Sequence, residues 1–115
     1  MSLRIYHNPR CSKSRQALDL LNEKGLNPEV IEYLKAPPSA QELDALLKAL
    51  KAEPRQIVRD KEGIYRELGL AEKALTREEW IEVLVKHPIL IERPIVVCGK
   101  KAVVARPPEK ALEIL

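Results

Sequence analysis

The chain has 115 residues, of which 45% are hydrophobic and 32% are charged, and its formal net charge is +3. This length corresponds to a single domain over residues 1–115 that can bury a core without disulfides or metal ions. The positive charge is mild and interspersed with acidic residues, which argues against a nucleic-acid partner. The longest apolar runs fall far short of the roughly 18 residues that a membrane-spanning helix needs, so we expect no membrane association.

The two cysteines are Cys11 and Cys98, too few for a disulfide scaffold. The first residues run directly into a strand-like segment, without the apolar stretch of a secretory signal. We therefore expect a reducing cytoplasm as the location of this protein.

The N-terminal third of the sequence predicts a strand, a helix and a second strand. Residues 3–7 alternate in hydropathy, residues 14–24 repeat apolar side chains at helical spacing up to Gly25, and residues 28–34 resemble a strand again. A helix of this length returns the chain to the same edge of the sheet, so the two strands should be parallel neighbours.

The middle of the chain predicts a run of short helices over residues 39–87. Ser39 with Glu42, and Thr76 with Glu79, have the spacing of helix-capping boxes. Residues 95–98 and 102–105 flank a glycine turn and predict a β-hairpin, and residues 106–109 begin a last helix. The fold class is therefore α/β, a four-stranded mixed sheet built from about 1–36 and 88–115, with an all-helical insertion over about 37–87.

Cys11 is the residue best placed for chemistry. It lies between a predicted strand and a predicted helix, where backbone N–H groups and the helix dipole favour a thiolate. Its polar neighbours argue against a buried structural cysteine. Because Ser14 replaces a second cysteine, a local disulfide cannot form; because position 17 is alanine, the arginine of a phosphatase loop is missing. Arginines distant in the sequence would have to bind any oxyanion.

Three arginines at element boundaries are candidates for that role: Arg59, Arg93 and Arg106. Arg93 and Arg106 precede prolines, which favours an extended backbone at both positions. Each guanidinium could donate paired hydrogen bonds to a tetrahedral oxyanion. Pro94, at the start of a predicted strand, is a candidate cis-proline.

The remaining polar candidates allow more than one interpretation. His7 could form a hydrogen bond near Cys11 or could simply end its strand. Ser14 could donate to the thiolate, although capping the helix is its simpler role. Cys98 lies within an apolar strand, which favours a small core residue over a redox partner.

Several motifs together resemble the glutaredoxin-coupled arsenate reductase family, in its short ArsC-like subgroup. The resemblance extends over essentially the whole chain and is carried by Ile5-Tyr-His-Asn-Pro-Arg-Cys11-Ser-Lys-Ser-Arg15, Tyr33-Leu with Pro37-Pro38, Leu68-Gly-Leu70, His87-Pro-Ile-Leu-Ile-Glu-Arg-Pro-Ile-Val-Val97 and Arg106-Pro-Pro-Glu109. It implies a thioredoxin-like fold with a helical insertion and a nucleophilic Cys11. By motif position, the resemblance makes Arg59, Arg93 and Arg106 the oxyanion-binding arginines, His7 and Ser14 the supports of the thiolate, and Pro94 the cis-proline.

The resemblance also implies a reaction. The Cys11 thiolate would attack arsenate, glutathione would attack the thio-arsenate adduct, and glutaredoxin would supply the remaining reducing equivalent. The partners are then arsenate, glutathione as co-substrate and glutaredoxin, with no bound cofactor and no metal. The sequence departs from better-characterised members at Ser12-Lys13, where they tend to have Gly-Thr, and it stops at Leu115 without the C-terminal tail that some of them carry.

Two other functions stay open at this point. One is a glutathione-dependent thiol oxidoreductase acting on mixed disulfides, for which arsenate is irrelevant. The other is a non-enzymatic regulator that binds a protein partner, as the related Spx-type transcription regulators do. Those regulators typically carry a Cys-x-x-Cys switch, and Ser14 argues against it.

Overall fold

The computed structural model describes residues 2–115, which form two compact units. One unit, the sheet unit, contains the residues up to Ala36 together with Arg93–Leu115. The other, the helical unit, is Pro37–Glu92. The first boundary agrees with the one expected from the sequence. The second differs, because residues 88–92, which we had placed with the sheet, pack within the helical unit.

The sheet unit contains four strands in the order β2-β1-β3-β4. β1 pairs with β2 in parallel, while β1 with β3 and β3 with β4 are antiparallel. This confirms the predicted parallel pair, the C-terminal hairpin and the mixed four-stranded sheet. The elements are β1 (Leu3–Tyr6), α1 (Ser12–Glu23), β2 (Glu29–Ile31), β3 (Ile95–Cys98), β4 (Lys101–Val104) and the 3₁₀ helix η4 (Pro108–Ile114).

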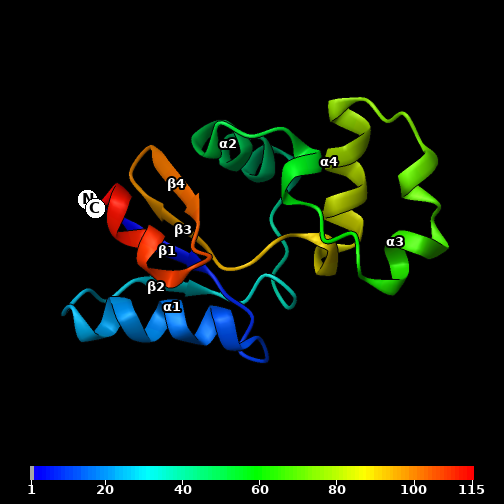
Figure 1. Ribbon diagram of the computed structural model, residues 1–115. Coiled ribbons are helices and arrows are strands. Elements are labelled where there is room, and N and C mark those ends of the chain that lie inside the picture. Colours follow the sequence, from blue (N-terminus) through cyan, green and yellow to red (C-terminus); the bar gives the residue numbers. More distant parts are fainter. Residues whose placement is uncertain (1) are drawn as a thin grey trace. The chain divides into compact units, whose positions relative to one another are not determined.

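The core of this unit lies between one face of the sheet and its two helices. Ile5 of β1 pairs with Val96 of β3, and both are fully buried against Ala17 and Leu21 of α1 and Ala111 of η4. In Figure 1, η4 (red) lies beside α1 along this part of the unit. Since the core fixes α1 against β1, it also fixes the loop between them, which carries Cys11.

The helical unit confirms the predicted run of short helices. Both predicted capping boxes are present: Ser39 with Glu42, and Thr76 with Glu79. α2 and α4 pack together over a core that includes Leu43, Leu47 and Leu84. The elements are α2 (Ala40–Leu50), η1 (Pro54–Ile57), α3 (Gly63–Glu67), η2 (Leu70–Glu72), α4 (Arg77–Lys86) and η3 (Pro88–Leu90).

Several elements differ in extent or type from those expected. β1 ends at Tyr6 instead of residue 7, and β4 is Lys101–Val104 instead of 102–105. β2 stops at Ile31, because β1 ends at Tyr6 and the last ladder bond is from His7 N–H to the Ile31 carbonyl; residues 32–36 then turn. α1 begins at Ser12 instead of Ser14. The last helix is a short 3₁₀ helix, entered through two prolines.

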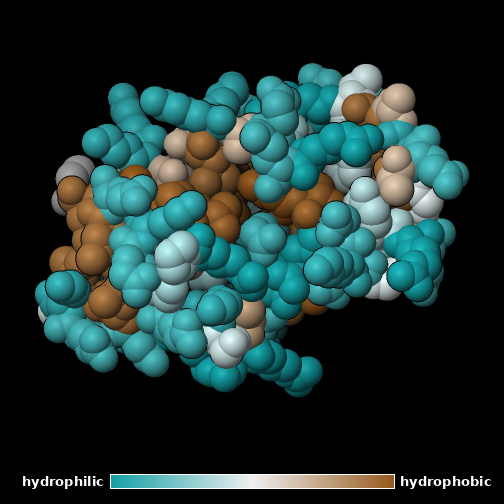
Figure 2. Space-filling model, viewed as in Figure 1, coloured by the Kyte–Doolittle hydropathy of each residue, from teal (hydrophilic) through white to brown (hydrophobic). Residues whose placement is uncertain are grey.

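Apolar residues also reach the surface around η4, as Figure 2 shows. Leu112 and Leu115 in this region are 36% and 48% exposed. Isolated exposed apolar side chains are ordinary on folded proteins, so this surface by itself indicates no function. No helix within residues 2–115 has the length and apolar character needed to cross a membrane.

Candidate active site

Cys11 occupies the N-cap position of α1, with extended backbone angles (φ −96°, ψ 121°). It is preceded by a turn in which the Cys11 N–H donates to the Asn8 carbonyl oxygen at 3.0 Å. Pro9 fixes the second position of this turn, where its φ is pre-set. The turn and the helix start together leave the thiol partly exposed, beside the N–H groups of the first helical turn.

The surroundings of Cys11 favour the thiolate. Burial raises the pKa of the thiol, but the backbone N–H groups of Ser14 and Lys13 and the guanidinium of Arg93 outweigh it, so the net pKa is lowered. Donors directed at the sulfur stabilise the charged form. The Cys11 thiol is therefore easier to ionise than an ordinary cysteine.

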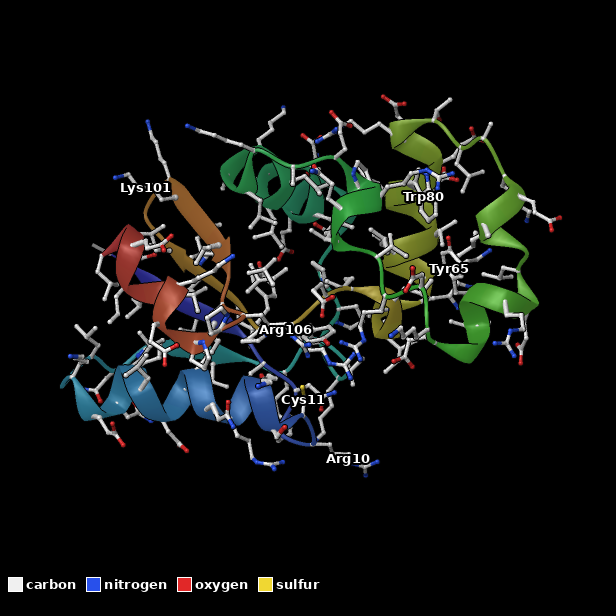
Figure 3. The ribbon with its side chains drawn as sticks, viewed as in Figure 1. Arg10, Cys11, Tyr65, Trp80, Lys101 and Arg106 are labelled. Atoms are coloured by element: carbon white, nitrogen blue, oxygen red, sulfur yellow. The ribbon has the colours of Figure 1, made fainter. Side chains whose placement is uncertain are left out.

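Arg106 and Arg93 lie at the same end of the sheet unit as Cys11. The Arg106 Nη2 donates to the Cys11 Sγ at 3.5 Å, and the Arg106 Nε donates to the Arg93 carbonyl oxygen at 2.6 Å. Figure 3 shows the Arg106 side chain directed toward Cys11, whereas Arg10 extends away from it. The structure therefore brings two of the three candidate arginines to the thiol.

The β3–β4 hairpin explains why these two arginines meet. Its register pairs Ile95 with Val104, and the Ala105 N–H donates to the Pro94 carbonyl at 2.9 Å. Arg93 and Arg106 follow as the next positions at the open end of the hairpin. The Arg93–Pro94 and Arg106–Pro107 peptide bonds are both cis. The second of these was not expected from the sequence.

Arg59 lies in the helical unit, two residues after the end of η1. Its Nε donates to Glu62 at 3.2 Å and its Nη1 donates to Glu92 at 2.9 Å. Burial lowers the pKa of this guanidinium. The Glu62 and Glu92 carboxylates raise the pKa by more than burial lowers it, so the group stays charged. The backbone is tied as well, since the Arg59 N–H donates to the Leu90 carbonyl at 2.7 Å. Arg59 is thus anchored to the segment that immediately precedes Arg93 in the chain.

His7 and Ser14 interact with each other behind the loop. Both are buried, and the His7 Nδ1 lies 2.6 Å from the Ser14 Oγ. The Ser14 Oγ also accepts a hydrogen bond from the Asn8 N–H at 3.0 Å. Within residues 2–115 the hydroxyl neither caps α1 nor contacts the Cys11 sulfur. The capping interpretation of Ser14 is therefore wrong, because the buried loop supplies closer partners than the helix end does.

The protonation of His7 follows from the same contacts. Desolvation by burial lowers the pKa of the imidazole, and the nearby Glu32 carboxylate opposes this only in part. A neutral ring can accept the Ser14 hydroxyl proton at Nδ1, which places its own proton on Nε2. Burial therefore favours the neutral form of His7, whose ring forms a hydrogen bond with Ser14 beside the loop.

Asn8 is a site residue that the sequence analysis used only as a turn signal. It is 5% exposed, and its Oδ1 accepts the Arg10 N–H at 3.0 Å. Its N–H donates to the Ser14 Oγ, and its carbonyl oxygen accepts from the Cys11 N–H. Asn8 therefore forms hydrogen bonds with three residues of the loop and the helix start. An Asn-Pro pair after a strand has the chemistry of such an Asx turn, and that signal could have identified it. Cys98, in contrast, is a buried residue of β3, as expected.

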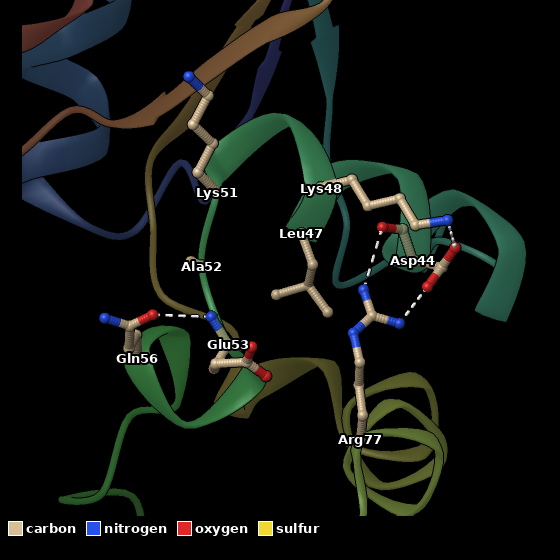
Figure 4. A pocket seen from close by; sticks show the side chains of 8 residues that line it. All are labelled: Asp44, Leu47, Lys48, Lys51, Ala52, Glu53, Gln56 and Arg77. Atoms are coloured by element: carbon tan, nitrogen blue, oxygen red, sulfur yellow. Dashed lines mark hydrogen bonds and ion pairs between the residues drawn. The ribbon is translucent and has the colours of Figure 1, made fainter.

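A pocket of about 480 Å³ lies in the helical unit between α2, η1 and α4 (Figure 4). The Asp44 carboxylate in its wall forms ion pairs with Arg77 and, at 3.1 Å, with Lys48. The Arg77–Asp44 ion pair joins α4 to α2, whereas Lys48 and Asp44 both belong to α2. None of the candidate catalytic residues lines this pocket.

Comparison with known proteins identifies close relatives. The model of the ArsC family matches residues 6–114. The chain is 46% identical over 116 residues to an arsenate reductase from Haemophilus influenzae, covering 100% of both chains. It is 51% identical over 114 residues to the uncharacterized protein YfgD from Escherichia coli, covering 98% of this chain and 96% of the relative.

A solved structure of an arsenate reductase from Vibrio cholerae superposes with a TM-score of 0.96 at 49% identity, covering 100% of this chain and 98% of the other. This match confirms the predicted α/β, thioredoxin-like fold with its helical insertion.

Proposed function

The chain belongs to the ArsC family, and we propose from this that it is an arsenate reductase with Cys11 as its nucleophile. The observation that carries the proposal is the Arg106 guanidinium 3.5 Å from a thiol whose pKa is lowered. A thiolate faced by cations suits attack on a tetrahedral oxyanion. The relatives named as arsenate reductases support arsenate as that oxyanion.

In the first step, the Cys11 thiolate attacks the arsenic atom, and one oxygen leaves as hydroxide or water. Both reactants are anions, so without counter-charges their approach is opposed by several kcal/mol where water is partly excluded. Arg93 and Arg106 supply positive charge beside the sulfur. We propose Arg59 as the third oxyanion-binding arginine, on its motif position.

External thiols complete the reduction in this proposal. Glutathione attacks the thio-arsenate adduct, and glutaredoxin supplies the remaining reducing equivalent as arsenite leaves. In sum, arsenic gains two electrons, two thiols become one disulfide, and one arsenate oxygen leaves as water. Ser14 stands where a local resolving cysteine would be, which fits dependence on thiols from outside. The need for reduced glutathione places the reaction in the cytoplasm.

A coupled assay tests the proposal by following arsenate-dependent NADPH oxidation with glutathione, glutaredoxin and glutathione reductase. Cys11→Ser should abolish the activity, and Arg93→Ala should weaken arsenate binding severely. Cys98→Ser is the matched control, because it removes the buried thiol of β3 and should leave turnover intact. Full activity in the Cys11→Ser variant would rule the assignment out.

The same assay separates the alternative of a glutathione-dependent thiol oxidoreductase. A reactive, partly exposed Cys11 suits that chemistry as well. Ready glutathionylation of Cys11 in mass spectra, without any arsenate turnover, would favour this second function.

A further inference from the structure

A second group of cations lies close to Cys11 in the sequence. Arg10, Lys13 and Arg15 are all exposed and lie within four positions of the cysteine. The first acidic residue of the chain is Asp19, and the first turn of α1 contains no acidic residue. Helix starts ordinarily favour acidic side chains, because these complement the dipole. The start of α1 instead carries basic side chains and no acidic one.

These cations are not neutralised by the unit that carries them. None of the three lies within ion-pair distance of a carboxylate among residues 2–36 and 93–115. The Arg15 Nη1 donates to the Pro9 carbonyl at 2.9 Å, which holds this charge over the loop. Like charges so close together repel one another, so the folded protein gains nothing from gathering them without counter-ions.

The two groups of cations around Cys11 differ in direction. Arg93 and Arg106 act on the sulfur itself. Arg10 extends away from the sulfur into open space (Figure 3). Arg93 and Arg106 therefore face whatever is bonded to Cys11, whereas Arg10, Lys13 and Arg15 are exposed to molecules in the solvent.

We propose that Arg10, Lys13 and Arg15 form a cationic rim that selects small thiols and disulfides bearing carboxylates, of which glutathione is the type. The role of such a thiol as reductant rests on the proposed function, and the rim deepens it by naming residues that recognise the co-substrate. The two carboxylates of the tripeptide would meet the rim as its sulfur nears Cys11. Such attraction extends over about 10 Å at 0.1 M salt.

The rim can be tested without arsenate, through thiol–disulfide exchange at Cys11. The thiolate attacks one sulfur of a disulfide, forms a mixed disulfide with it, and releases the other half as a thiolate, so no further oxidant is needed. Three probes differ in charge: glutathione disulfide is negative, bis(2-hydroxyethyl) disulfide is neutral and cystamine is positive. The rate of modification is read by mass spectrometry, with Cys11→Ser as the blank.

The test variant is Arg10→Gln/Lys13→Gln, which leaves the Arg15–Pro9 hydrogen bond in place. The matched control is Lys24→Gln, an exposed charge at the far end of α1, about 18 Å along a helix of this length. Each variant is compared with the wild type for every probe, so the intrinsic reactivity of the disulfides cancels.

Relative to the neutral probe, which corrects for any change in the thiolate fraction of Cys11, the double variant should slow the reaction with glutathione disulfide about fivefold at low ionic strength and accelerate cystamine. The differences should shrink in 0.5 M salt, and Lys24→Gln should match the wild type. An equal change with all three probes, or no change with glutathione disulfide, would overturn the rim. If the three probes respond to the double variant according to their charge but the wild type does not turn over arsenate, only the proposed function is overturned.

Discussion

Arg106 joins Cys11 to Arg93 through a single guanidinium, with its Nη2 3.5 Å from the Cys11 Sγ and its Nε 2.6 Å from the Arg93 carbonyl oxygen. Only a side chain with donors fixed in a planar fork can serve both atoms at once. The contact to the carbonyl holds the guanidinium in place, so that its other edge faces the sulfur.

Replacing Arg106 by lysine keeps the charge and removes the fork. We expect Arg106→Lys to lower kcat/KM for arsenate by about tenfold to a hundredfold, since a hydrogen bond to a charged group contributes roughly 1.5–3 kcal/mol. The coupled assay measures this loss. Arg66→Lys, at an exposed arginine of α3, is the control and should keep full activity. Wild-type kinetics in Arg106→Lys would show that charge alone suffices.

Asn8 should control the reactivity of Cys11 through the loop. Asn8→Ala removes the acceptor of the Arg10 N–H, which costs about 1 kcal/mol of stability and loosens the presentation of the sulfur to the Ser14 and Lys13 N–H groups. The pKa of Cys11 should then rise toward its ordinary value. Because only the thiolate reacts, alkylation by iodoacetamide at neutral pH should slow, and its pH profile should move upward.

Asn8→Asp separates loop geometry from electrostatics. The carboxylate restores the acceptor and with it the stability, but it adds a negative charge close to the sulfur. It should therefore raise the pKa of Cys11 while the midpoint of urea unfolding returns toward that of the wild type. Alkylation profiles of all three proteins in a Cys98→Ser background report Cys11 alone. An Asn8→Ala profile that coincides with the wild type would show that the turn holds without this side chain.

Most of the sheet unit follows from local sequence. The predicted hairpin turns at Gly99 and Lys100, and Arg93 lies as many residues before this turn as Arg106 lies after it. Since paired positions in an antiparallel hairpin are equidistant from its turn, their meeting could have been deduced. Gly99 itself has φ 60°, a value that favours glycine.

Side-chain partners were less accessible to prediction. A serine in the first turn of a helix can bond either the helix end or the loop before it, and periodicity does not distinguish the two. Ser14 bonds the loop, because His7 and Asn8 are buried beside its hydroxyl. Likewise, Glu62 lies three residues from Arg59 and could be read as its partner, but Glu92 lies 33 positions away and is brought there only by the packing of the helical unit.

Burial of His7 makes stability depend on pH. Desolvation lowers the folded pKa of His7 below that of the unfolded chain, about 6.5. Below pH 6.5 the unfolded chain binds a proton that the folded protein does not, so stability should fall as the pH decreases toward the folded pKa. Urea unfolding between pH 5 and 8 measures this slope. His7→Gln should reduce the slope, with the loss of its hydrogen bond assessed at pH 8, where the imidazole is neutral in both states. An unchanged slope would assign the acid sensitivity to other groups.

Glu92 should oppose the proposed role of Arg59. It receives the Arg59 Nη1 at 2.9 Å, and both side chains are about one quarter exposed, at 26% and 22%. Glu92→Gln keeps the size and an acceptor oxygen but removes the charge. Discounted for partial exposure, the loss of stability should be about 1 kcal/mol or less in urea unfolding.

The effect on arsenate should have the opposite sign. With Glu62 and Glu92 both on Arg59, two negative charges offset one positive charge, and an incoming oxyanion meets net repulsion. Glu92→Gln should therefore lower KM for arsenate, whereas Arg59→Ala should raise it. The two variants, measured side by side in the coupled assay, distinguish competition from support: if Glu92→Gln raises KM as Arg59→Ala does, the carboxylate acts by holding the guanidinium in position. If neither variant changes KM, Arg59 does not bind the oxyanion, and its ion pairs serve the helical unit alone.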